Sequence, residues 1–258
     1  MAEDPGQAKH PGQAKHPAQF AVDAFWDVRD RAGRKQVEIG KVDAGERGKV
    51  TAGQHMAQLE EIVIEEFVRA GIPRTSIRRK TGIELPGYYR PAKKWDVVVF
   101  DRGILVAAIE FKSQVGPSFG NNVNNRSEEA IGSAADVWRA YEEGTFGRIR
   151  PWLGYFFLLE ATKKSTAPVS LPKPVFPVDD IFHGTSYADR YRILCQRLVR
   201  ERLYDAACFL TTSAGPPATL DEPDQELGFA NFAAAIAGRV SYIQALPGET
   251  TKGQGSLI

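Results

Sequence analysis

The sequence predicts a mixed α/β (α+β) fold in a single domain, and three observations support this expectation. Segments with the apolar period of helices alternate with short, β-branched apolar runs along the chain. Two such runs, at 95–100 and 104–112, are separated by three residues ending in Gly103, a pattern typical of a β-hairpin. The chain has 258 residues, 43% of them hydrophobic and 25% charged, which suffices for one large domain with a buried core.

The domain is expected to cover residues 20–245, between two tails. The first tail, 1–19, contains the hexapeptide PGQAKH twice in succession, and a segment so rich in Pro and Gly buries too little apolar surface to fold. We expect this low-complexity tail to be disordered and the C-terminal tail, 246–258, to be flexible. A Gly-rich, charged stretch at 40–53 lacks the Gly-Lys-Ser/Thr of a phosphate-binding loop and is expected to form a connecting loop.

Predicted helices and strands follow one another from residue 54 onward. Residues 54–70 are expected to form an amphipathic helix, because apolar side chains recur there at three- and four-residue spacing: Met56, Leu59, Val63 and Phe67. After the hairpin, a Gly- and Asn-rich loop at 116–126 is expected to lead into another helix. The remaining expectations are helices at 127–143, 186–203 and 226–237, strands at 153–159 and 206–212, and a Pro-containing loop at 167–178.

Composition excludes several classes of protein. Lys and Arg number 33 against 32 Asp and Glu, and the net charge of +1 argues against a polybasic protein, although a local basic groove remains compatible with it. No run approaches the ~20 apolar residues of a membrane span, and the N-terminus lacks an apolar signal core. The two cysteines, Cys195 and Cys208, have no metal-ligand or redox spacing and fit a reducing compartment. We therefore expect a cytoplasmic, globular protein with no membrane contact.

The predicted hairpin places charged side chains at its open end. If residues 101–103 form the loop, Asp96 pairs with Ala108, and Glu110 is the diagonal neighbour of Asp96. Lys112 lies on the same face, two residues further along. That face also carries Val98, Phe100, Ile104, Val106 and Ala108. The opposite face is apolar throughout, with Trp95, Val97, Val99, Leu105, Ala107, Ile109 and Phe111. A one-residue shift of register would put Asp96 and Glu110 on opposite faces.

Two carboxylates and a lysine on one face suit a hydrolase that uses a divalent metal ion. Carboxylate oxygens are hard ligands for Mg2+, which acidifies a bound water and stabilises the charge that develops on a phosphodiester. Lys112 would orient that water or neutralise transition-state charge. The alternative is structural: Asp96 begins a strand, and Glu110 forms a surface ion pair with Lys112. The Asp…Glu-x-Lys spacing alone does not decide between the two.

Amide side chains follow the second strand of the hairpin in large number. Five amides and one guanidinium lie close together in the sequence: Gln114, Asn121, Asn122, Asn124, Asn125 and Arg126. Asn and Gln pair bidentately with adenine, and Arg with guanine, in the major groove of DNA. The alternative is an Asn-rich turn that caps the next helix. Because a cap needs only one such residue, the run indicates a segment that reads DNA bases.

These residues resemble a known family. The resemblance rests on Trp95-Asp96 and on the continuous stretch 108–132, with further support at 85–91 and 190–195. They closely resemble the XhoI family of type II restriction endonucleases, over about residues 20–240. The Asp…Glu-x-Lys triplet is that of the wider PD-(D/E)XK nuclease superfamily, in which proline usually stands at the position of Trp95.

The resemblance implies a fold, a reaction and partners. The fold would be a PD-(D/E)XK restriction-endonuclease-like core, with a central mixed sheet flanked by helices. Asp96 and Glu110 would bind Mg2+ together with the main-chain carbonyl of Phe111, and Lys112 would assist hydrolysis. A homodimer would cut double-stranded DNA at the palindrome CTCGAG, and a cognate methyltransferase would act on the same site without obligatory contact. A further metal ligand on the 54–70 helix, Glu61 or Glu65, is possible in such enzymes, although solvated helix charges are the simpler interpretation.

Further DNA contacts are expected from basic residues just before the hairpin. They would hold the phosphate backbone without reading sequence, and they are Arg78, Arg79, Lys80, Arg90, Lys93 and Lys94. Two other functions remain open: a structure-specific or repair nuclease of the same superfamily, and a non-catalytic DNA-binding protein in which the triplet is structural. Replacement of Glu110 by alanine separates these classes, because only a nuclease has cleavage to lose.

Overall fold

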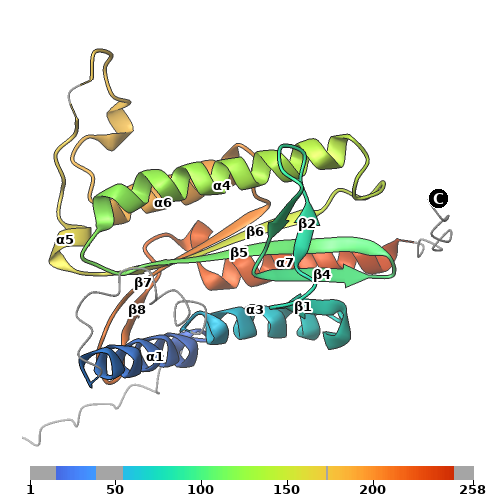
Figure 1. The fold of residues 1–258 in the computed structure, drawn as a ribbon, viewed down its shortest axis with the longest axis horizontal. Helices are drawn as coiled ribbons and strands as arrows, with labels where there is room; N and C mark the ends of the chain where they lie inside the picture. The colour runs from blue at the N-terminus through green and yellow to red at the C-terminus, as the bar shows by residue number, and fades with distance from the viewer. Residues whose placement is uncertain (1–15, 39–54, 173, 247–258) are drawn as a thin grey trace, which may run out of the picture.

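A six-stranded mixed sheet runs through the centre of the protein (Figure 1). The computed structural model describes residues 16–38, 55–172 and 174–246. In spatial order the strands are β1 (Ile77–Arg79), β4 (Val97–Asp101), β5 (Ile104–Gln114), β6 (Trp152–Glu160), β7 (Ala206–Ser213) and β8 (Thr219–Asp221). The central strands β5, β6 and β7 are parallel, whereas β1, β4 and β8 run antiparallel to their neighbours. The predicted mixed α/β fold is confirmed.

Helices cover both faces of this sheet (Figure 1). One face packs against α4 (Phe119–Glu142) and α6 (Tyr187–Arg200), and the other against α1 (Gln19–Glu38), α3 (Ala57–Arg69) and α7 (Phe229–Ala245). The shorter helices are α5 (Lys163–Thr166) and three 3-10 turns, Arg74–Ser76, Asp180–Phe182 and Gln225–Leu227. Among the described helices, none has the length and apolar character that a membrane crossing requires.

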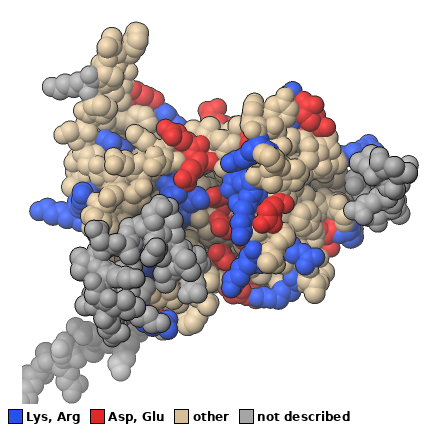
Figure 2. Space-filling view, in the orientation of Figure 1, with Lys and Arg blue, Asp and Glu red and all other residues tan. Residues whose placement is uncertain are grey.

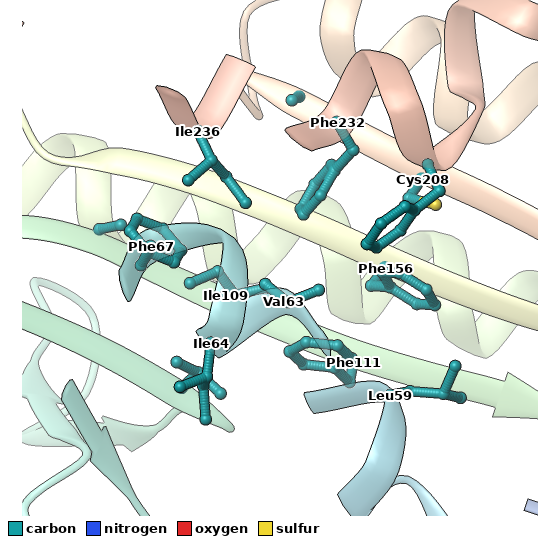
Figure 3. Packing of buried hydrophobic residues seen from close by; sticks show 14 of the residues in the cluster. Leu59, Val63, Ile64, Phe67, Ile109, Phe111, Phe156, Cys208, Phe232 and Ile236 are labelled. Carbon is teal, nitrogen blue, oxygen red and sulfur yellow. The ribbon is translucent and has the colours of Figure 1, made fainter. Parts of the chain in front are cut away.

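Apolar side chains at helical spacing explain how α3 docks on the sheet. Leu59, Val63 and Phe67 are fully buried, and they meet side chains of β5, β6, β7 and α7 in one cluster (Figure 3). The rings of Phe111 on β5 and Phe156 on β6 stack there with centroids 5.2 Å apart. Burial of each large apolar side chain contributes ~1.5–3 kcal/mol, so this cluster fixes α3 against the strand that carries Glu110.

A second, two-stranded sheet stands beside β4. It consists of β2 (Glu84–Pro86) and β3 (Ala92–Lys94). Its turn is tied to α4 by Asp136, which accepts hydrogen bonds from the backbone N–H groups of Tyr88 and Tyr89, each at 2.8 Å, and from Arg90 Nε at 2.7 Å. A Cβ at Gly87 would collide with the Asp136 carboxylate, so the close approach requires glycine there. The small sheet is thereby held next to the open end of the β4–β5 hairpin.

Most of the predicted long elements are confirmed, and several local predictions are wrong. The helices expected at 54–70, 186–203 and 226–237 correspond to α3, α6 and α7. However, α4 begins at Phe119, so residues 119–126 are helical and do not form the predicted loop. The Asn122 amide donates to the Ser118 carbonyl within this first turn, and packing of buried Phe119 outweighs the low helix propensity of asparagine.

The packed chain also begins earlier than Phe20. Ala18 is fully buried and His16 lies 2.9 Å from the Glu222 carboxylate, whereas Phe20 itself is exposed. Three predicted segments lie outside the described residues: the N-terminal tail up to residue 15, the loop at 40–53, and the C-terminal tail from residue 247.

The β4–β5 hairpin differs from its predicted register. Its loop has two residues, Arg102 and Gly103, both with positive φ (48° and 78°), and a β-bulge lies between Val99 and Phe100. Val97 therefore pairs with Ile109, two residues away from the predicted register. Because side chains alternate with a period of two, a shift of two residues keeps each side chain near the open end on its predicted face.

Beyond the bulge the predicted faces are wrong. Leu105 belongs to the cluster under α4 and α6, whereas Ile104 and Val106 belong to the cluster under α1, α3 and α7. Trp95 also packs on the α4 side, next to the small sheet, because it precedes β4 and does not follow the alternation of that strand.

Candidate active site

The carboxylates of Asp96 and Glu110 lie side by side at the open end of the hairpin. The Asp96 N–H donates to the Ile109 carbonyl at 3.3 Å, one residue before the paired register of β4 and β5 begins at Val97 and Ile109. Asp96 therefore lies beside the stretch of β5 that carries Glu110. One Asp96 carboxylate oxygen accepts a hydrogen bond from the Phe111 N–H at 2.8 Å, which orients it along the edge of β5.

Two lysines neutralise Glu110. Lys112, two residues further along β5, pairs with one carboxylate oxygen, and Lys93 from β3 pairs with the other. The Glu110 side chain is only 7% exposed. Burial alone would raise the pKa of Glu110, but the two ammonium groups outweigh burial and hold this pKa below its ordinary value. Glu110 is therefore a buried anion at neutral pH.

Asp96 has the opposite electrostatic setting. Its burial and the neighbouring negative charge of Glu110 raise the pKa of Asp96, and the Phe111 hydrogen bond offsets only part of that rise. Two adjacent carboxylates that repel each other in a partly desolvated place attract a cation. This charge pattern supports a metal site at the open end of the hairpin.

A third carboxylate, Glu60 of α3, faces the same place. It is 8% exposed, and burial together with the charge of Asp96 raises its pKa to about 7. Arg79 Nε lies 3.5 Å from the Glu60 carboxylate and moderates this rise. Glu60 is not among the site residues predicted from the sequence. A signal for it was present: it lies three, four and seven residues before Val63, Ile64 and Phe67, and thus on the apolar stripe of its helix.

Glu61 and Glu65, the acidic residues considered from sequence, point elsewhere. Both pair with Arg74, and Glu61 also lies 3.2 Å from Arg79 Nη1. These contacts are at the partly exposed edge of α3, so the simpler interpretation, helix charges near solvent, fits their placement.

A cavity of about 400 Å³ connects these groups with α4. Its lining includes Glu60, Asp96 and Lys112 on one side and Asn122 and Arg126 on the other. On the face shown in Figure 2, the surface is hollowed near its centre, and acidic and basic side chains lie side by side around the hollow. The site therefore combines anionic groups for a cation with cationic groups for a polyanion.

The donor set fits a hard divalent ion of small size. Asp96 and Glu110 would supply carboxylate oxygens, and the adjacent Phe111 carbonyl would supply a neutral one. Oxygen ligands of this kind suit Mg2+, which usually keeps several waters. No group of three or more His, Cys, Asp or Glu with metal-binding geometry exists among the described residues, so the protein would provide few ligands. The burial of Asp96 next to a second carboxylate, that of Glu110, is what favours a cation there.

The predicted DNA-contacting residues fall into different settings. Asn121, Asn124 and Asn125 are exposed on α4, whereas Asn122 and Arg126 are half-buried and line the cavity. Gln114 is buried, and its amide donates to the Val115 and Ser118 carbonyls at 2.9 and 3.4 Å.

Three of the basic residues before the hairpin, Arg90, Lys93 and Lys94, also differ from one another. Arg90 is exposed but held by Asp136, and Lys94 is exposed. Lys93 points into the site, where it contacts Glu110 and has an 11% exposed side chain. Arg90 and Lys94 therefore have the surface positions expected of phosphate contacts, whereas Lys93 does not.

Comparisons with known proteins identify the family of the chain. The family described as restriction endonuclease XhoI matches residues 35–218. The type II restriction enzyme BstVI of Geobacillus stearothermophilus is 41% identical over 212 residues, covering 79% of this chain and 95% of the relative. The type II restriction enzyme XhoI of Xanthomonas vasicola is 44% identical over 188 residues, or 70% of this chain and 73% of the relative.

A third relative, the type II restriction enzyme AbrI of Azospirillum brasilense, is 49% identical over 147 residues, covering 56% of this chain and 66% of the relative. No solved structure matches the chain. The fold and these relatives define a site-specific deoxyribonuclease that acts on double-stranded DNA, a class that generally uses divalent metal ions. The chain belongs to the XhoI family of type II restriction endonucleases.

Proposed function

We propose that this protein is a magnesium-dependent type II restriction endonuclease that cuts double-stranded DNA at the palindrome CTCGAG. The observation that supports this proposal most directly is that Asp96 and Lys112, the latter paired with Glu110, line a cavity whose other wall is the amide-rich start of α4. A restriction enzyme must join base reading to cleavage, and here one continuous segment, β5 followed by α4, contributes to both. CTCGAG is the site implied by the family resemblance.

The three residues have distinct roles in this proposal. Asp96 and Glu110, with the Phe111 carbonyl, hold Mg2+, which when bound acidifies water and offsets charge on the phosphodiester. Asp96 keeps its orientation through the Phe111 N–H. Lys112 is less buried than Glu110, and its ammonium group stands at the mouth of the site, where it orients the attacking water or stabilises the charged phosphate.

Base reading is assigned to the exposed side chains in the first turns of α4. Asn121 and Asn125 are four residues apart and share one outward face, while Asn122 and Arg126 share the face towards the cavity. Arg126 Nη1 pairs with Glu129 at 2.6 Å, which leaves guanidinium donors for DNA. Gln114 serves the local backbone instead, and it supports the start of α4.

The proposed partner is a second copy of the chain, because a palindrome cut in both strands needs two related active sites. A segment between α5 and α6 projects from the body and carries Val175 and Phe176, which are 97% and 80% exposed (Figure 1). Apolar side chains so exposed on a projection favour a protein contact.

Replacement of Phe176 by Asp is expected to shift the protein from dimer to monomer in sedimentation velocity. An unchanged sedimentation coefficient would place the dimer contact elsewhere. A cognate methyltransferase would protect the same site without touching this protein.

The test is cleavage of two plasmids, one with a single CTCGAG site and one without it, with Mg2+ and with EDTA. The expected result is linearisation of the first plasmid alone, only with Mg2+, and its loss in Glu110→Ala while a gel shift persists. Cutting of both plasmids would favour a repair or structure-specific nuclease. Binding without cutting by the unaltered protein would favour the non-catalytic DNA-binding alternative.

A further inference from the structure

A second lysine, Lys93, reaches Glu110 from outside the Asp…Glu-x-Lys motif. It belongs to β3 and is 17 positions before Glu110, yet its ammonium group pairs with the carboxylate oxygen that Lys112 leaves free. Nothing in the triplet predicts this contact, since the small sheet that carries Lys93 is a separate element.

Strand alternation explains why Lys93 points inward and Lys94 does not. In the β2–β3 ladder, Lys93 is opposite Leu85, which is 3% exposed, whereas Lys94 is opposite exposed Glu84. Directly paired residues share a face of the sheet. The inner face therefore carries Leu85 and Lys93 towards Glu110, and the outer face carries Glu84 and Lys94 towards solvent.

Three contacts fix the Lys93 ammonium group. Besides Glu110, it donates to the Lys94 carbonyl at 3.3 Å and lies over the Trp95 ring, 4.5 Å from the centroid. Its side chain is 11% exposed, whereas that of Lys112 is 21% exposed and also approaches Glu129 at 3.9 Å. Lys93 is thus the more enclosed of the two lysines, and Lys112 has the freer path towards the cavity.

We propose that Lys93 is a positioning residue of the active site, which holds the Glu110 carboxylate so that Lys112 is released to act on the DNA phosphate. The inference rests on the proposed function. If Lys112 alone neutralised Glu110, its movement towards a phosphate before a metal ion is bound would leave a buried carboxylate without a cationic partner, which is costly. With Lys93 in place, Glu110 keeps one ion pair throughout.

This role has a consequence that distinguishes it from a DNA contact. The positive charge of Lys93 competes with a metal ion for the oxygens of Glu110, so its removal strengthens metal binding while it slows cleavage. A residue that contacts only phosphate would weaken DNA binding and reduce its salt dependence, without an effect on the metal.

The test replaces Lys93 by Met, which keeps the aliphatic stem over Trp95, and by Arg, which keeps the charge. Tb3+ serves as a hard, oxygen-seeking probe of the site, and its luminescence is excited through tryptophan in the absence of DNA. The Asp96→Asn titration is subtracted, so that only the signal that depends on Asp96 is compared. Lys94→Ala is the matched control, because it removes the same charge from the next residue of the same strand.

For Lys93→Met we expect about tenfold tighter Tb3+ binding and roughly 100-fold slower cleavage at saturating Mg2+, with partial recovery of cleavage in Lys93→Arg. Lys94→Ala should retain the Tb3+ titration of the unaltered protein. Lys163→Ala, which replaces an exposed lysine of α5, is the control for cleavage. Either of two results overturns the inference: unchanged Tb3+ affinity in Lys93→Met, or cleavage by Lys93→Met as fast as that by Lys163→Ala. If the unaltered protein fails to cut CTCGAG, the proposed function fails, and the Tb3+ titrations still decide whether Lys93 competes at Glu110.

Discussion

The Asp96 carboxylate accepts a hydrogen bond of 2.8 Å from the backbone N–H of Phe111. This bond joins the residue before β4 to the middle of β5 and brings the Asp96 side chain beside Glu110. Because burial and the charge of Glu110 raise the pKa of Asp96, its charged form carries an electrostatic cost, which a bound cation would relieve. This role of the two carboxylates can be tested with conservative variants.

Asp96→Asn should abolish cleavage and preserve the fold. The asparagine carbonyl oxygen can still accept the Phe111 N–H, so the local geometry is kept while one metal-binding charge is lost. We expect at least about a thousandfold loss of cleavage rate, with a melting temperature equal to or above that of the unaltered protein. Gel-shift affinity for CTCGAG DNA in Ca2+ is the control. A variant that retains more than a tenth of the cleavage rate would remove Asp96 from the catalytic group.

Glu60→Gln should stabilise the protein at alkaline pH. The folded pKa of Glu60, about 7, exceeds the unfolded value of about 4.3, so the folded state keeps a proton that the unfolded state has released. Between these values the free energy of unfolding falls as pH rises. With a discount for partial exposure, the variant should be more stable by about 2 kcal/mol at pH 8, with the difference vanishing near pH 4.

Urea unfolding in EDTA at both pH values measures this difference. Glu61→Gln, at the partly exposed edge of the same helix, is the matched control. If Glu60 also serves the metal site, the stabilised variant will cut DNA more slowly, as expected where function maintains a strained charge. Equal stability of Glu60→Gln and the unaltered protein at pH 8 would show that Glu60 is solvated.

The sequence predicts much of this fold because its signals are local. The stripe of Leu59, Val63 and Phe67 identifies α3, and the apolar run of β6 identifies a buried central strand. The predicted start of α4 is wrong because asparagine by itself favours turns. Only the packing of Phe119 under the helix makes these asparagines helical. Such tertiary effects leave no local pattern.

The candidate site was predictable in part for a related reason. The face shared by Asp96 and Glu110 follows from strand alternation, which survives a register error of two residues. The bulge itself was not predictable, because nothing in Val99 or Phe100 identifies it. Glu60 had a usable signal, a carboxylate on an apolar helix stripe. No local sequence signal identifies Lys93, because its contact with Glu110 depends on how the small sheet docks.

Asp136→Asn should loosen the small sheet. Asp136 accepts three hydrogen bonds from Tyr88, Tyr89 and Arg90, and these bonds outweigh the effect of burial and hold the pKa of Asp136 below its ordinary value. A depressed folded pKa means that the stabilisation is present above the unfolded value of about 3.9 and is lost as pH falls below it. We expect a loss of about 2 kcal/mol at pH 7.

That loss should shrink at pH 3, because the Asp136 carboxylate of the unfolded protein, with a pKa of about 3.9, takes up a proton there while that of the folded protein resists protonation. Glu142→Gln, an exposed residue of the same helix, serves as the control and should change stability by less than about 0.5 kcal/mol. Because Lys93 sits on the small sheet, Asp136→Asn is also expected to slow cleavage. A loss of stability that is the same at pH 3 and pH 7 would contradict the electrostatic explanation.

Sequence recognition should depend unequally on the three exposed amides of α4. Asn121 and Asn125 share the outward face next to the cavity, whereas Asn124 borders an apolar pocket with Val123 and Ile131 on the far side of the helix. Each amide that pairs with a base contributes about 1–3 kcal/mol of discrimination, or roughly 5- to 150-fold in relative rate. Asn121→Ala and Asn125→Ala should therefore lose selectivity for CTCGAG over sites with one altered base pair, and Asn124→Ala should have the smallest effect. Cleavage rates on a panel of single-substitution sites measure the ratio for each variant. If Asn124→Ala relaxes selectivity most, the far side of α4 faces the DNA, and the proposed docking of the duplex over the cavity is wrong.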